Sequence, residues 1–412
     1  MTGLTIEAAV AALKAHDGRI LYAARQLGVP KRTLSDFVAR SFAAKAGADT
    51  MDVPPDRRAQ EIVKLRGEVT RLRAEIEATH RLNLDAEFVR ETIMGLAAAP
   101  ADPPNWLVKA PAKRGFAGLP ITIWSDWHIG EKVNPAEVNG VNAFDERIAR
   151  ERVKRLVERT IDIAANHMTG ERANGIVVNA LGDFVTGEIH EELSWSNDLR
   201  VLPSVLLARD LMLWGLRTLA DHFGRVFVAC ASGNHGRNTH KIHSKGFIFK
   251  NFDWLIYQLL ERAFAEAGDK RVVFMNDPSN EAYYSVYGHR YLAVHGHDLG
   301  VKGGDGIIGA IGPIMRGEIR TAGSSAQIGR SFDTLVIGHW HQSLWLPRAI
   351  VNNALIGFNE YARAPLRARY SRPSQSLWFQ HPKHGITAKW EIFLEDLKTG
   401  PAAEPVQWGR AA

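Results

Sequence analysis

Five short polar motifs stand in the middle of this chain, and their residue types suit metal binding. They are Asp126-Trp127-His128, Gly182-Asp183, Gly233-Asn234-His235, His295-Gly296-His297 and Gly338-His339-Trp340-His341. Seven of their oxygen and nitrogen donors are candidate metal ligands, and no cysteine stands among them. Such a set favours hard or borderline divalent cations. The chemistry indicated is that of a dinuclear metallohydrolase.

Each motif follows an apolar run that predicts a buried strand. The runs are Ile121–Ile123, Ile176–Val178, Val226–Val228, Tyr291–Val294 and Leu335–Ile337. Short runs of aliphatic and β-branched residues are typical of strands with both faces covered. Ligands of open α/β sheets bind at the carboxyl ends of the strands. We therefore expect the five motifs to lie along one rim of a sheet.

Alternation along extended backbone predicts how neighbouring motif residues face. Asp126 and His128 flank one residue that points the other way, so both should face the same cavity. The same period of two brings His339 and His341 onto one side.

Three further histidines are assigned by their positions in the motifs. His235 directly follows Asn234 and is expected to turn away from it, toward a substrate. His295 ends its strand and is the preferred ligand. His297 is expected to contact the substrate or support the ligands.

The order and spacing of the motifs resemble the calcineurin-like metallophosphoesterase superfamily. Its signature runs D-x-H, G-D, G-N-H, a strand-end His and G-H-x-H, and all five blocks stand here in that order. A lone Gly-Asp or Gly-Asn-His is usually a turn, so only the five blocks together are specific. The resemblance covers roughly residues 118 to 395. It implies an α/β fold, an α/β/β/α sandwich with helices outside.

The resemblance also implies two divalent metal ions, Mn²⁺ first, with Fe, Zn or Ni as alternatives. The ligands would be Asp126, His128 and His341 for one metal, Asn234, His295 and His339 for the other, and Asp183 for both. One bridging carboxylate lets two cations lie about 3.5–4 Å apart, as two-metal hydrolysis requires.

By the same resemblance, His235 would be the catalytic residue that protonates the leaving group or stabilises the transition state. Two positions depart from the family pattern. Gly236 stands where many relatives have an acid, and Thr186 where they often have a second Asp. Neither is a metal ligand, so the departures bear on the protonation of His235. Arg237 is expected to contact the phosphate of the substrate.

Composition bounds the class of protein. The chain has 412 residues, 45% of them hydrophobic, which is enough for one large domain with appendages. Cys230 is the only cysteine, so a disulfide within the chain is excluded and a reducing compartment is favoured. No signal-peptide pattern begins the sequence, and no apolar stretch approaches the ~20 residues of a membrane span. We expect a cytoplasmic protein with no membrane partner.

Residues 1–45 predict a small all-α helix-turn-helix domain that binds DNA. Three helical patterns are followed by a break each, and Ala23 to Leu34 reads Ala-Ala-x-x-Leu-Gly-Val-Pro-x-x-Thr-Leu, which resembles the Fis-like type. The DNA contacts would be Lys31, Arg32, Thr33, Ser35 and Arg40. The alternative is a three-helix adaptor.

Residues 46–117 are expected to hold linkers and a short coiled-coil helix. Apolar residues repeat there at 3-4-3-4 spacing, namely Ile62, Leu65, Val69, Leu72 and Ile76. Such a seam predicts a homodimer through residues 62–76. A helix packed on the catalytic domain is the alternative. Residues 118–395 would be the phosphoesterase domain and residues 396–412 a tail.

The charge distribution bears on the partner. Residues 1–45 carry seven Lys and Arg against three Asp and Glu, and residues 302–372 carry nine against four. Two basic regions in an otherwise nearly neutral background suit an acidic polymer such as DNA.

Three functions stay open on this basis. The first is a metal-dependent DNA phosphodiesterase, or nuclease, delivered by its own helix-turn-helix. The second is a phosphomonoesterase acting on protein serine or threonine phosphate or on a small metabolite. The third is a non-catalytic DNA-binding regulator, which the intact ligand set disfavours. The basic regions favour the first, and the arrangement is similar to proteins carried by phages and prophages.

Overall fold

The computed structural model describes residues 5–16, 20–38, 107, 117–189, 192–299, 311–366 and 368–396. The chain divides into two units, Met1–Val89 and Arg90–Ala412. The predicted seam at 62–76, the tail after residue 396 and Arg40 lie outside the described residues. Across the part of the chain that is described, no helix combines the length and apolarity needed to cross a membrane.

The described part of the first unit is helical. It holds α1 (Ile6–Ala15), α2 (Ile20–Gln26) and a third helix over residues 31–38. Small side chains let these helices pack closely, and the buried set is Ala9, Ala12, Ala23, Ala24 and Leu34. Gly28 ends the second helix with a φ of 65°, a backbone conformation that glycine adopts without strain.

The second unit contains a six-stranded sheet in the order β11-β10-β1-β2-β3-β4. Its strands are β1 (Leu119–Trp124), β2 (Ile176–Ala180), β3 (Val226–Cys230), β4 (Val272–Met275), β10 (Ser374–His381) and β11 (Gly385–Phe393). β1 to β4 are parallel, and β10 and β11 pair antiparallel at one side. Every residue of β1, β2 and β3 is buried, as the continuous apolar runs predict.

A second, five-stranded sheet has the order β5-β6-β7-β9-β8. Its strands are β5 (Ala282–Val286), β6 (His289–Ala293), β7 (Thr334–Ile337), β8 (Leu344–Trp345) and β9 (Ala349–Val351). β6, β7 and β9 are parallel, and β5 and β8 are antiparallel. The protein is therefore mixed α/β with two mixed sheets.

The expectation of one rim on a single sheet is wrong. The first three motif strands, β1, β2 and β3, belong to the six-stranded sheet, whereas β6 and β7 belong to the five-stranded one. Sequence periodicity reports that a strand is buried on both faces, but it does not report which sheet the strand joins.

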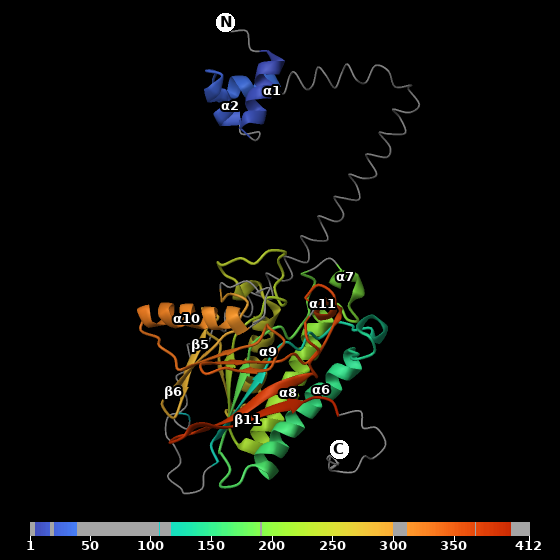
Figure 1. Cartoon of the computed structure of the whole chain (residues 1–412), viewed down its shortest axis with the longest axis vertical. Helices are drawn as coiled ribbons and strands as arrows, with labels where there is room; N and C mark the ends of the chain where they lie inside the picture. The colour runs from blue at the N-terminus through green and yellow to red at the C-terminus, as the bar shows by residue number, and fades with distance from the viewer. Residues whose placement is uncertain are drawn as a thin grey trace, which may run out of the picture. The chain divides into compact units, whose positions relative to one another are not determined.

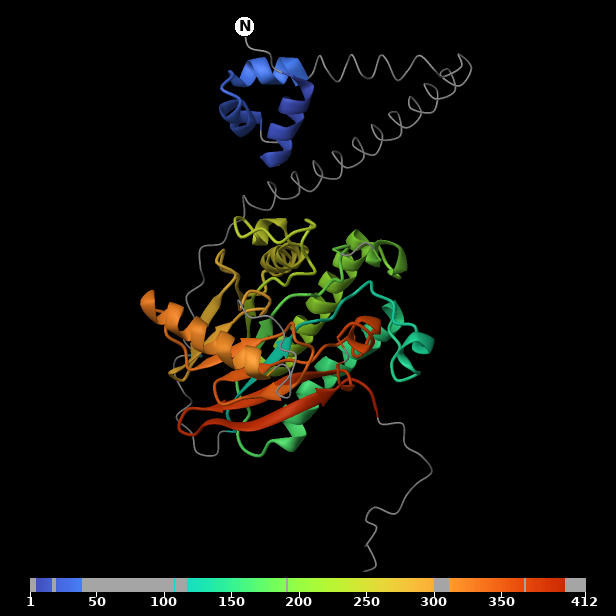
Figure 2. The same cartoon turned by 45° about the horizontal axis from the view of Figure 1, so that its top comes forward.

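Helices cover the outer faces of both sheets. They are α6 (Glu146–Asp162), α8 (Val201–Phe223), α9 (Phe252–Glu266) and α10 (Ile311–Gln327). One apolar core joins α6, α8 and α9 to the six-stranded sheet, a second lies between the sheets, and a third lies under α10. Figures 1 and 2 show α6 and α8 side by side, with α10 on the other side of the sheets.

Short elements complete the described part of this unit. They are α7 (Leu193–Ser196), α11 (Glu360–Arg363), 3-10 turns at Pro135–Val138 and Ile248–Lys250, and a π-helical turn at Ile163–His167. Upstream of residue 117, Leu107 is fully buried in the core between the sheets, and its carbonyl accepts a hydrogen bond from the Tyr287 N–H. The second unit therefore includes residues before the predicted boundary at 118.

Candidate metal centre

Three groups of candidate ligands lie at one end of the two sheets. They are Asp126, His128 and His341; His128, Asp183 and His235; and Asp183, His295 and His339. Within each group the ligand atoms all lie within 4.8 Å of one another. The groups share His128 and Asp183, so they form one continuous chain of donors contributed by both sheets. Such buried clusters could hold metal ions.

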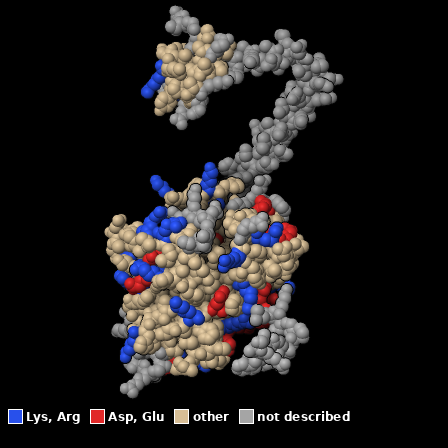
Figure 3. Space-filling model, in the orientation of Figure 1, with Lys and Arg blue, Asp and Glu red and all other residues tan. Residues whose placement is uncertain are grey.

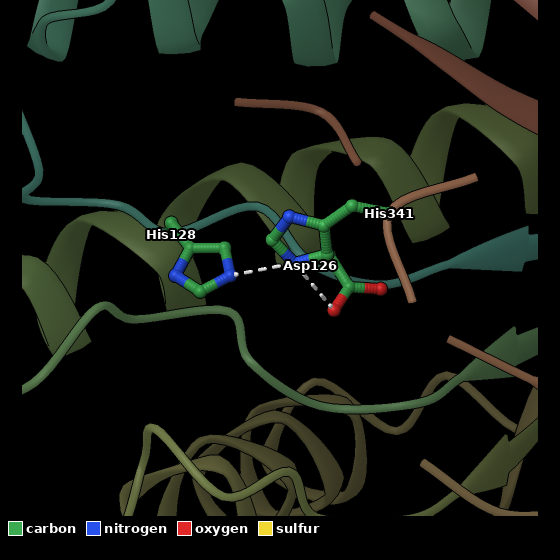
Figure 4. A group of neighbouring side chains, drawn as sticks. All are labelled: Asp126, His128 and His341. Atoms are coloured by element: carbon green, nitrogen blue, oxygen red, sulfur yellow. Dashed lines mark hydrogen bonds and ion pairs between the residues drawn. The ribbon is translucent and has the colours of Figure 1, made fainter. Parts of the chain in front are cut away.

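The first group converges from two strand ends (Figure 4). His128 Nε2 lies 3.3 Å from His341 Nε2, which lies 3.3 Å from Asp126 Oδ1. Two donors each about 2.1 Å from one cation, at angles between about 90° and 109°, would be about 3.0–3.4 Å apart. The observed spacings match this range.

The other end of the chain of donors carries buried atoms that lack partners. His295 Nε2 lies 3.0 Å from Asp183 Oδ2, at ion-pair distance, and meets hydrogen-bond geometry with no atom of the described residues. Asn234 Oδ1 is buried and also has no partner in that part of the chain. An unpaired buried polar atom costs about 1–3 kcal/mol. A cation would satisfy both atoms, so this donor set fits a metal.

The backbone is strained at most of the candidate ligands. Eight described residues other than glycine have positive φ, and five of them are Asp126, His128, Asp183, His339 and His341, with φ between 51° and 65°. The left-handed conformation costs an L-residue roughly 1–2 kcal/mol. Strain of this kind collects at functional sites, where the surrounding fold holds it in place.

Asp126 and His128 share one donor group, as predicted, but strand alternation is not the reason. β1 ends at Trp124, so neither residue lies in a strand. Both have left-handed backbone, with φ of 55° and 51°. This repeated turn brings their side chains into one group, while Trp127 between them is fully buried in the core beneath the helices.

A hydrogen-bond network holds Asp126. The backbone N–H of His339 donates to Asp126 Oδ1 and Oδ2 at 3.0 and 3.1 Å. Ser125 Oγ donates to Asp126 Oδ2 and accepts from Asn352 Nδ2. This network therefore ties a candidate ligand in the loop after β1 directly to the loop that follows β7.

His295 is oriented by a carbonyl oxygen. Its Nδ1 lies 2.6 Å from the carbonyl oxygen of Leu181. Because a carbonyl only accepts, Nδ1 carries a proton, and Nε2 is the ring nitrogen directed at Asp183. Histidine ligands of metals commonly have such a partner for their other nitrogen.

Burial keeps two of the histidines neutral. Burial, and then the neighbouring His235 and His341, lower the pKa of His128 well below its usual value. Burial, and then His295, lower the pKa of His339 to about 3. A neutral imidazole has a lone pair available for a metal, so little free energy is needed to remove a proton first.

Asp253 is an important residue that the sequence motifs do not reveal. This fully buried carboxylate in the first turn of α9 accepts N–H bonds from Asp183 and Gly233, both 2.9 Å long, and from Phe184 at 3.1 Å. It thereby fixes the loops after β2 and β3 to each other. The signal was available as an Asn cap at Asn251 followed by an acid in the first turn, but that pattern usually marks only a helix start.

His235 has its own positioning contacts. Its Nδ1 lies 3.0 Å from the carbonyl oxygen of Thr186, and its backbone N–H donates to Asp183 Oδ1 at 2.7 Å. The carbonyl at Thr186 thus orients the imidazole although the side chain there is not an acid. The Thr186 hydroxyl donates to Glu131 instead, at 2.9 Å.

The two predicted substrate contacts have different surroundings. His297 is absent from the three donor groups, and its ring lies 5.1 Å from that of Phe247. The Arg237 guanidinium donates to the carbonyls of Asn234, Thr239 and His240, so it holds its own loop together. A phosphate contact would have to use its remaining N–H groups.

The predicted DNA contacts lie in the first unit. Lys31, Arg32 and Thr33 are exposed at the start of the third helix, whereas Ser35 is half-buried.

The sequence matches no protein-family model, and no curated protein matches it significantly.

Proposed function

We propose that this chain is a metal-dependent phosphoesterase of the calcineurin-like superfamily, and that it hydrolyses phosphodiester bonds of DNA. The observation that carries the proposal is the position of Asp183. This one buried carboxylate belongs to two of the three donor groups, with a buried unpaired nitrogen of His295 beside it. A carboxylate shared in this way suits a pair of cations.

The proposed ligand sets follow the donor groups. Asp126, His128 and His341 would hold one divalent ion, Asn234, His295 and His339 the other, and Asp183 both. Mn²⁺ is the ion proposed, with Fe, Zn or Ni as alternatives. Bound cations would neutralise negative charge on the phosphate and make a water acidic enough to attack it near neutral pH.

His235 is proposed as the proton donor to the leaving oxygen. The Thr186 carbonyl fixes the tautomer, because it requires a proton on Nδ1. Nε2 is then the nitrogen that exchanges a proton with the substrate. The neighbouring Asp183 carboxylate receives the His235 backbone N–H, which fixes the loop that carries the imidazole. A positioned imidazole typically contributes 10²–10⁴-fold to rate.

DNA is proposed as the substrate on accessory features. Exposed Lys31 and Arg32 begin the third helix of the first unit, as a recognition helix requires. In this proposal the unit is a Fis-like helix-turn-helix, with Thr33 and Ser35 adding contacts. Arg40 and a dimer through residues 62–76 stay predictions.

One comparison of substrates tests the reaction class. Purified protein with Mn²⁺ is assayed on labelled single- and double-stranded DNA, on bis-p-nitrophenyl phosphate and on p-nitrophenyl phosphate. The proposal expects turnover of DNA and a preference for the diester. A clear preference for p-nitrophenyl phosphate would favour a phosphomonoesterase, and no turnover of any ester by metal-loaded protein would favour a non-catalytic DNA-binding regulator.

Delivery by the first unit is tested by deleting residues 1–89, which leaves Leu107 in the core of the second unit. The shortened protein should keep its kcat on bis-p-nitrophenyl phosphate and lose affinity for duplex DNA. The affinity of the full chain should fall steeply with salt. Equal duplex affinity in both proteins would show that the first unit does not read DNA.

A further inference from the structure

Residues 236–250, which we call the basic loop, begin directly after the candidate metal centre and return to the ring of His297 beside it. The loop follows Asn234 and His235 directly, and near its end the Phe247 ring lies 5.1 Å from the ring of His297. The ring of His297 lies in turn 5.5 Å from that of His295. The loop is therefore a wall of the site on the side of Asn234 and His295.

The base of the basic loop is tightly fixed. Arg237 donates to three carbonyls of the segment 234–240. The Asn238 N–H donates to the Lys250 carbonyl at 2.9 Å, and Arg237 forms an isolated β-bridge with Asn251. Because these contacts join the two arms at the base, residues 241–246 form the tip of a loop whose base is fixed next to Asn234.

The tip is exposed and carries uncompensated positive charge. Residues 241–246 are all exposed and include Lys241 and Lys245. From residue 234 to 252 the sequence has no Asp or Glu, and neither lysine has an ion-pair partner within the described ranges. Figures 1 and 2 show this yellow-green segment projecting from one end of the unit, and basic side chains project from that end in Figure 3.

We propose that the basic loop binds the phosphates next to the scissile one on a single strand of nucleic acid. This inference rests on the proposed function and names its substrate class. A small phosphomonoester offers one charged group, which the metal centre alone would take. Exposed lysines outside the centre match further negative charges, and a strand supplies one with every nucleotide. The exposed Ile242 between them offers an apolar contact to a base or sugar.

The test removes the two charges and compares a matched control. The full chain carries Lys241→Gln with Lys245→Gln, and the control carries Lys270→Gln with Lys383→Gln. Lys270 precedes β4, and Lys383 lies in the turn between β10 and β11. Both are exposed at the end of the six-stranded sheet that lies away from the candidate metal centre. The probes are fluorescein-labelled oligothymidylate of about 20 nucleotides, which has no duplex for a helix-turn-helix, and bis-p-nitrophenyl phosphate.

The loop variant should have a kcat/KM on the oligonucleotide at least about tenfold below that of wild type, with the loss in KM. Its affinity should depend less on salt. The slope of log affinity against log salt concentration should become less steep by about 1.4, for two lost contacts to a single strand. Its turnover of bis-p-nitrophenyl phosphate should stay within about twofold of wild type, because the lysines lie outside the donor groups. The control should match wild type on both probes.

Equal oligonucleotide KM and salt slope in the loop variant and the control would overturn the inference. So would an undiminished rate on DNA together with a loss on a phosphoserine peptide, which would assign the loop to protein substrates. If the wild type cleaves no diester, the proposed function fails, but fluorescence anisotropy of the same variants still tests whether the loop binds the strand.

Discussion

The backbone N–H of Asp183 donates a 2.9 Å hydrogen bond to the carboxylate of Asp253. The same carboxylate accepts the N–H of Gly233, one residue before the candidate ligand Asn234. Burial, and then the nearby Asp183, raise the pKa of Asp253 to about 7, although its three backbone donors oppose that shift. Asp253, whose charged form is disfavoured by burial, therefore links Asp183 to the loop after β3 that carries Asn234.

Replacing Asp253 should weaken metal binding without touching a ligand. In Asp253→Ala three buried N–H groups lose their acceptor, so the two loops should lose their fixed spacing. We expect Mn²⁺ affinity to fall by about 10–100-fold, the usual effect of removing support from ligands. Titration calorimetry measures this, with Glu261→Gln on the same helix as the control. Wild-type affinity in a folded Asp253→Ala protein would remove the positioning role.

His235→Ala should spare metal content but lower turnover. A lost general acid typically costs about 10²–10⁴-fold in kcat. The loss should be smaller for nitrophenyl esters than for DNA, because nitrophenolate leaves without a proton. Parallel kinetics and metal analysis check both points. Since His235 also lies in a donor group with His128 and Asp183, loss of metal from this variant would instead make it a ligand.

His295→Ala should harm the site more than His297→Ala. His295 directs an unpaired nitrogen at Asp183, whereas His297 stands outside the donor groups. We expect His295→Ala to lose about one metal per chain, because a two-metal site needs each side chain that binds an ion directly. His297→Ala should keep both ions. Metal content by plasma emission decides the ranking. The reverse order would exchange their roles.

Gly182→Ala should destabilise the fold far more than Gly268→Ala. Both glycines have positive φ, 78° and 65°, but a Cβ at Gly182 would lie 2.0 Å from the backbone nitrogen of Gly233, and one at Gly268 would meet open space. We expect a cost of about 1 kcal/mol at Gly268 from backbone strain alone and above about 3 kcal/mol at Gly182. Urea unfolding measures the difference. Equal costs would show that the two loops can separate freely.

The sequence predicts the strands and the gathering of polar residues well. Runs such as Ile176–Val178 are buried on both faces, and burial of that kind leaves a continuous apolar pattern. Asp126, Asp183 and His339 each follow the end of such a strand by two or three residues, so their position near strand ends is a local property. The small helices of the first unit follow from local periodicity in the same way.

The rest depends on contacts that are distant in the sequence. Asp253 meets Asp183 across 70 residues, and no local pattern reports that pairing. The left-handed backbone of His128 and His341 is imposed by the surrounding fold, so period-two alternation assigns the wrong cause. The division of the motif strands between two sheets has the same origin, since periodicity carries no information about pairing.

The dinuclear centre is tested most directly by the number of Mn²⁺ ions that metal-stripped full-length protein binds, measured by equilibrium dialysis and plasma emission. We expect about two ions per chain in wild type and fewer than one in Asp183→Asn, because the shared carboxylate loses its charge. A wild-type value near zero, in protein shown to be folded, would contradict a dinuclear centre and with it the proposed hydrolase.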